Sequence, residues 1–183
     1  MNHTFWSCIG GCVLAVVTAL GSVPCYAQEK FSYNYSNPPE TSKYIRDYSI
    51  EVDDMPGHKV RIVEIQRIYT KDHPMIMGTK VLEMWFRGFT DYGSSGGPGH
   101  GYETWILEDG NKLFLESVFL SSTEGTATGS RRGTSHSTVR FVGGTGKYAS
   151  IRGSFSSSVE FDSDPKAGYN RPTSHGEYWF VNQ

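Results

Sequence analysis

Cysteine is confined to the first part of this sequence, where Cys8, Cys12 and Cys25 are its three cysteines. Residues 9–20 form an apolar run that is too short to span a membrane, and Cys25-Tyr26-Ala27 places small side chains at the two positions that a signal peptidase reads. We therefore predict a signal peptide at 1–27, cleaved after Ala27, and a secreted or periplasmic protein. The remaining chain would hold no thiol, which excludes cysteine catalysis, thiolate metal sites and disulfide bonds.

Net charge and helical periodicity are also scarce. The sequence has 17 Lys and Arg residues against 19 Asp and Glu residues, a formal net charge of −2, so it lacks the basic surface that nucleic-acid binding requires. Almost no stretch repeats with a helical period, whereas 14% of the residues are aromatic and 21 are glycine. We expect a polar N-terminal lead at 28–43 and a single all-β domain at 44–183. The histidines of this domain show no His-x-His or His-x-x-x-His spacing, so no metal site is expected.

Alternating apolar and polar residues predict eight strands in that domain. Their predicted ranges are 44–53, 58–69, 79–90, 101–108, 112–120, 135–142, 150–161 and 174–181. Eight strands at this spacing predict a single antiparallel up-and-down β-barrel, with an open sandwich of the same strands as the alternative. The links at 91–100, 121–134 and 162–173 are long and rich in Gly, Ser and Pro, whereas those at 109–111 and 143–149 are tight. We therefore expect the long links to gather at one mouth of the barrel.

The stretch FVGGTGKYASIRGSF, from Phe141 to Phe155, is predicted to be two strands joined by a glycine turn. A phosphate-binding loop would need a glycine at the position of Phe141 and a Ser or Thr at the position of Tyr148, so nucleotide binding is not expected. The stretch resembles the glycine-turn signature of the allene oxide cyclase barrel and dirigent protein superfamily. That resemblance implies a calycin-like barrel, trimeric as well as cavity-forming, that acts without a cofactor.

The resemblance also implies a role. Allene oxide cyclases fold a fatty-acid-derived epoxide for ring closure, and dirigent proteins orient phenoxy radicals, so both hold a reactive and largely apolar molecule in one conformation. We expect a barrel that binds a small apolar or aromatic molecule and steers its cyclisation, isomerisation or lyase-type conversion. A non-catalytic, lipocalin-like carrier and an oligomeric structural subunit are the alternatives. The cysteine near the site of the plant cyclases has no counterpart after residue 27.

Three predicted strands carry an apolar face and a second face that combines tryptophan with an acid. The paired residues are Glu83 with Trp85, Glu103 with Trp105, and Glu177 with Trp179. If these faces point into the barrel, burial would displace the pKa of Glu83 and Glu103 toward values useful in acid–base catalysis, and Arg87 could stabilise an anion or a carbonyl. The expected ligand-binding residues are then Trp85, Tyr102, Trp105, Trp179 and Arg140. If the faces point outward, their tryptophans would form the subunit interface of a trimer or dimer. The sequence leaves both orientations open.

Overall fold

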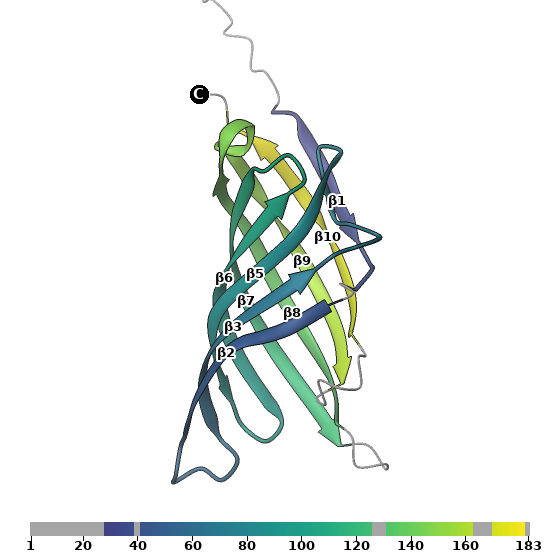
Figure 1. Ribbon diagram of the computed structural model, residues 1–183. Helices are drawn as coiled ribbons and strands as arrows, with labels where there is room; N and C mark the ends of the chain where they lie inside the picture. Colours follow the sequence, from purple (N-terminus) through teal and green to yellow (C-terminus); the bar gives the residue numbers. More distant parts are fainter. Residues whose placement is uncertain (1–27, 39–40, 126–130, 163–169, 182–183) are drawn as a thin grey trace, which may run out of the picture.

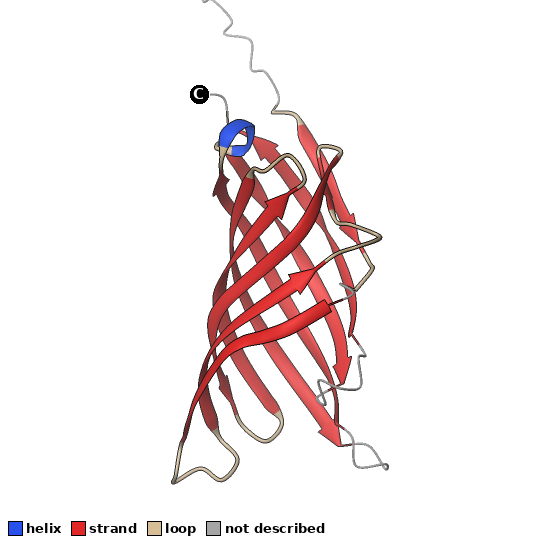
Figure 2. Ribbon diagram, in the orientation of Figure 1, coloured by secondary structure: helices blue, strands red, loops and turns tan. Residues whose placement is uncertain are grey.

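The protein is built almost entirely from β-strands (Figure 2). The computed structural model describes residues 28–38, 41–125, 131–162 and 170–181. The predicted signal peptide lies outside the described residues. The elements are β1 (Lys30–Tyr35), β2 (Thr41–Glu51), β3 (Lys59–Ile68), β4 (Met75–Ile76), β5 (Thr79–Tyr92), β6 (Gly96–Leu107), β7 (Lys112–Gly125), β8 (Arg131–Gly144), the 3-10 turn η1 (Gly146–Tyr148), β9 (Ile151–Asp162) and β10 (Asn170–Phe180). None of these elements is a helix long and apolar enough to cross a membrane.

The strands form one antiparallel sheet of ten strands in the order β1-β10-β9-β8-β7-β6-β5-β3-β2, with the short β4 paired to β5. All eight predicted strands are present, as β2, β3 and β5 to β10. The closed eight-stranded barrel is not confirmed, because β1 and β2 stand at the two ends of the sheet and share no ladder within the described residues. The extra strand β1 comes from the segment predicted to be a polar lead. It pairs with β10 along the edge that β2 would have to occupy to close an eight-stranded barrel.

The sheet is strongly curled (Figure 1). Trp105 on β6 and Tyr33 on β1 have ring centroids 5.8 Å apart, although four strands lie between β1 and β6 in the sheet. Such a contact requires that the sheet bend over the face that carries both rings, which we call the concave face. Large side chains fill one end of the concave face and form the main core. Its most deeply buried members include Leu107, Leu113, Leu115, Phe141, Tyr148 and Ile151.

The glycine turn between β8 and β9 closes that end of the curled sheet (Figure 1). Gly146 has φ +54°, and a Cβ on it would lie 2.4 Å from Oδ1 of Asn111, so glycine is required by both conformation and space. The turn delivers Tyr148, which is fully buried and donates a hydrogen bond from its hydroxyl to Oγ1 of Thr79 at 2.8 Å. The turn is therefore structural, and a strand follows it.

The predicted long link at 91–100 is mostly strand. β5 continues to Tyr92 and β6 already begins at Gly96, so the link shrinks to a few residues. Glycines in this segment allow close packing: a Cβ on Gly99 would lie 2.2 Å from the ring of Phe119 on β7. This short link lies at the same end as the β2–β3 link, while the β6–β7 link and η1 lie at the opposite end (Figure 1). The central residues of the other two long links, 126–130 and 163–169, lie outside the described residues.

The orientation of the tryptophan faces, which the sequence left open, differs between the strands: it is inward on β6 and outward on β5 and β10. On β6, Glu103 and Trp105 lie on the concave face and are buried. On β5 the register shifts between Val81 and Glu83. This irregularity puts Val81 on the concave face, whereas Glu83 and every second residue after it lie on the outer face.

Candidate functional site

A buried carboxyl group lies on the concave face at the border of the main core. Glu103 is 9% exposed and stands between Phe86 of β5 and Leu115 of β7, both of which are buried. Nε1 of Trp105 donates a hydrogen bond to Oε2 of Glu103 at 2.8 Å. Burial raises the pKa of Glu103, while the Trp105 hydrogen bond and the positive charge of Arg67 lower it less. The net effect raises the pKa of Glu103, so the neutral form of its carboxyl extends to higher pH than in an exposed glutamate.

Three further polar side chains interact electrostatically with Glu103. Arg67 on β3 lies opposite Met84, and its Nη1 donates to Sδ of Met84 at 3.2 Å. Burial is the largest of the effects that raise the pKa of Tyr33 and that raise the pKa of Tyr69 to about 12; the charge of Glu103 contributes to both rises, and Arg67 opposes the rise at Tyr69. Both phenols therefore keep their protons at neutral pH and can act as hydrogen-bond donors.

This group of residues, which we call the Glu103 cluster, combines Glu103, Trp105, Arg67, Tyr33 and Tyr69. A neutral carboxylic acid can donate a proton, and a guanidinium can stabilise an oxygen atom that becomes negative. Arg67 and Met84, which also lie on the concave face, are half-buried. The cluster thus places acid, cation and hydroxyl donors against aromatic walls, which is the composition of a small-molecule site.

The burial of Glu103 is expected to make the stability of the protein depend on pH. The folded-state pKa of Glu103 lies above the ordinary value of 4.5. The folded protein therefore loses stability as the pH rises from about 4.5 through that folded-state pKa. Glu103→Gln cannot ionise, so the free energy of unfolding of the natural protein should fall relative to this variant as the pH rises from 4.5 through the folded-state pKa of Glu103. Urea unfolding at a series of pH values measures the difference, with Glu83→Gln as a control that removes a carboxylate from the outer face. Parallel pH profiles for the natural protein and Glu103→Gln would contradict the buried carboxyl.

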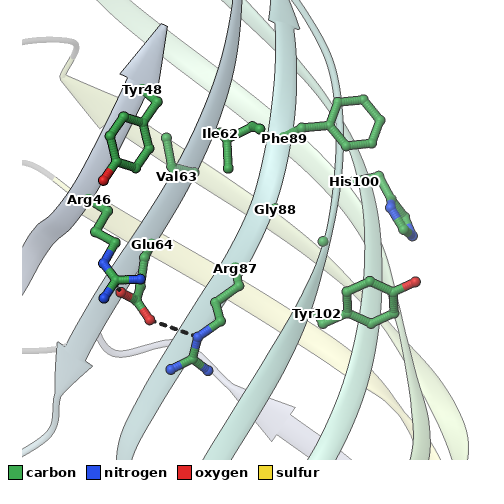
Figure 3. Close-up of a pocket in the computed structure, with 11 residues that line it drawn as sticks. Arg46, Tyr48, Ile62, Val63, Glu64, Arg87, Gly88, Phe89, His100 and Tyr102 are labelled. Atoms are coloured by element: carbon green, nitrogen blue, oxygen red, sulfur yellow. Dashed lines mark hydrogen bonds and ion pairs between the residues drawn. The ribbon is translucent and has the colours of Figure 1, made fainter.

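Two of the predicted site residues lie together on the outer face instead. Arg87 of β5 and Tyr102 of β6 are directly opposite each other in the ladder and border a hollow of about 400 Å³ (Figure 3). Nε of Arg87 lies 2.7 Å from Oε1 of Glu64, whose Oε2 is 3.5 Å from Nε of Arg46. Phe89 and His100 border the same hollow. Arg87 thus lies on the opposite side of the sheet from Glu103, and the structure does not bring these two predicted catalytic residues together.

The remaining predicted residues are scattered over the outer face. Glu83 accepts a hydrogen bond from Nε2 of Gln66, and Trp85 lies under the guanidinium of Arg87, 5.1 Å from its Cζ. Trp179 is half-buried, with Nζ of Lys30 5.9 Å from its ring. Arg140 is exposed and ion-paired with Glu116. Of the predicted residues, only Glu103 and Trp105 therefore meet in the interior.

Sequence reasoning missed Arg67, Tyr33 and Tyr69. Tyr33 belongs to the run Phe31, Tyr33, Tyr35, in which every second residue is aromatic. This period of two is the sequence pattern that would have predicted the strand β1. Arg67 and Tyr69 follow the β3 alternation, but nothing local shows that they approach β6. Among the residues that the structure describes, no group of three or more His, Cys, Asp or Glu side chains is placed to hold a metal ion.

No protein-family model, curated protein or solved structure matches this chain. The resemblance to allene oxide cyclase barrels and dirigent proteins therefore stays a prediction from the sequence.

Proposed function

We propose that this protein binds a small apolar or aromatic molecule against the concave face beside Glu103. We further propose that it steers the cyclisation, isomerisation or lyase-type conversion of that molecule without a cofactor. Glu103 would exchange a proton with the ligand, and Arg67 would stabilise the negative charge that develops on a ligand oxygen. Tyr33 and Tyr69 would orient polar groups by hydrogen bonding, while Trp105 would position Glu103. Export after cleavage near Ala27 is part of the same proposal.

The observation that supports this most is the burial of Glu103. A carboxyl group buried between Phe86 and Leu115 costs stability, and an apolar residue of similar size would pack there without that cost. Displaced pKa values inside a polar cluster are characteristic of functional sites. The aromatic side chains around it favour a largely apolar ligand.

Two fluorescent anionic probes with apolar bodies test the ligand site: trans-parinaric acid, which is a chain, and anilinonaphthalene sulfonate, which is aromatic. The protein lacking residues 1–27 should bind at least one of them saturably. Arg67→Met removes the cation but keeps an apolar stem, so it should weaken binding about tenfold, equivalent to about 1.4 kcal/mol. Arg87→Met, on the outer face, is the matched control and should change nothing.

The outcomes separate the alternatives. Saturable binding that depends on Arg87 and not on Arg67 would place the ligand in the outer hollow and contradict the proposed site. Absence of saturable binding by either probe would contradict the proposal as a whole. Binding without any conversion of ligands retained from the natural source would favour the lipocalin-like carrier.

Self-association into a trimer or dimer is a second candidate property. It is favoured by apolar side chains on the outer face that are exposed in the single chain, among them Tyr48, Ile62 and Phe89.

A further inference from the structure

The outer face carries large apolar side chains in one line across neighbouring strands. Tyr48, Ile62, Phe89 and Val118 lie at successive ladder positions on β2, β3, β5 and β7, with His100 of β6 between the last two. They are 67%, 63%, 48% and 52% exposed, respectively. Monomeric proteins seldom expose a contiguous apolar patch of this kind, so a covering partner is expected. We call this line the apolar row.

A line of charges, the ionic row, runs beside the apolar row. Its five central positions are Glu64, Arg87, Tyr102, Glu116 and Arg140, on β3, β5, β6, β7 and β8 in that order, and Arg46 of β2 continues the row beside Glu64. Tyr102 is 58% exposed and occupies the middle position. Figure 3 shows Glu64, Arg87 and Tyr102 on one side of the hollow and Ile62 and Phe89 on the other.

The ionic row carries opposite charges at equal distances on the two sides of Tyr102. If the row is turned end for end about Tyr102, Arg87 takes the place of Glu116 and Glu64 takes the place of Arg140. Each exchange pairs opposite signs, whereas a like-charge overlap would be costly. The same reversal brings Phe89 onto the position of Val118 in the apolar row. A surface with this symmetry suits a second copy of the same chain, because a two-fold contact requires a self-complementary patch.

We propose that the outer face of β5, β6 and β7 binds the same face of a second copy, about a two-fold axis that runs along β6 past Tyr102. Arg87 of each copy then faces Glu116 of the other, and Phe89 packs against Val118. Phe89 and Val118 supply the apolar centre of the contact, and Arg87 with Glu116 fixes its register. The contact uses the side of the sheet opposite the Glu103 cluster, so it is independent of the ligand site.

Charge reversal tests the symmetry directly in the protein lacking residues 1–27. Sedimentation velocity should show a dimer at micromolar concentration. Arg87→Glu and Glu116→Arg should each raise the dissociation constant about tenfold or more, because each puts like charges opposite one another. The double variant Arg87→Glu, Glu116→Arg restores opposite charges across the axis, although it breaks the ion pairs with Glu64 and Arg140 within each copy. Its dissociation constant should therefore fall below that of either single variant.

A cysteine crosslink provides the second readout, since the chain after residue 27 has no cysteine of its own. Tyr102→Cys lies next to the proposed axis and should give a covalent dimer with a short bismaleimide crosslinker, which spans the distance of about 10 Å between facing sheets. Thr173→Cys, an exposed position on β10, is the control and should stay monomeric on a non-reducing gel. A natural protein that sediments as a monomer at every concentration or as a trimer would overturn the proposal. A double variant no better than the single variants would also overturn it.

Discussion

Glu103→Gln will lower the turnover number for conversion of the natural ligand about 10²- to 10⁴-fold, the usual contribution of a general acid or base. Glutamine keeps the size of the side chain and can still accept the hydrogen bond from Nε1 of Trp105, but it cannot exchange a proton. The ligand can be identified by native mass spectrometry of protein purified from its own source, and steady-state kinetics then measure the loss.

Glu83→Gln is the matched control for this experiment. Glu83 lies on the outer face and is held by Gln66, so its replacement should leave the turnover number unchanged. Full activity of Glu103→Gln would rule out the acid–base role of Glu103. A lower turnover number in Glu83→Gln alone would indicate that the reaction takes place on the outer face.

Phe141→Ala will lower the free energy of unfolding by about 3–5 kcal/mol, the range for deletion of a buried phenylalanine ring. Phe141 is 1% exposed, and its ring centroid lies 5.9 Å from those of both Trp105 and Tyr178. Its removal would leave a cavity in the middle of the main core. Urea unfolding monitored by tryptophan fluorescence measures the loss.

Val142→Ala, at the next position of β8, is the control for Phe141→Ala. Val142 points to the outer face and is 37% exposed, so its truncation should cost no more than about 0.5 kcal/mol. If the two variants lost similar amounts of stability, the concave face would not be the packed core of the protein.

The strands could be predicted from the sequence because a strand with one buried face alternates apolar and polar residues. All eight predicted ranges correspond to strands, and the glycine turn at Gly146 has the positive φ that the sequence predicts. The run Phe31, Tyr33, Tyr35 has the same period, but it is short and lies among polar residues, so β1 was missed. Closure could not be predicted because it depends on which strand occupies the edge of β10.

The candidate site was only partly predictable, for a geometric reason. An irregularity of one residue reverses the face of everything that follows in a strand, and the shift between Val81 and Glu83 separated Glu83, Trp85 and Arg87 from Glu103. The approach of Arg67 and Tyr69 to Glu103 depends on how the sheet curls. No local pattern encodes that approach.

The most direct test of this account is a pH titration of the Glu103 side-chain carboxyl carbon by NMR, with its signal assigned by its absence from Glu103→Gln. A midpoint clearly above the ordinary value of 4.5 is the predicted result, because burial between Phe86 and Leu115 disfavours the charged form. A midpoint at or below 4.5 would show a solvated or ion-paired carboxylate, and would contradict the neutral buried acid on which the proposed function rests.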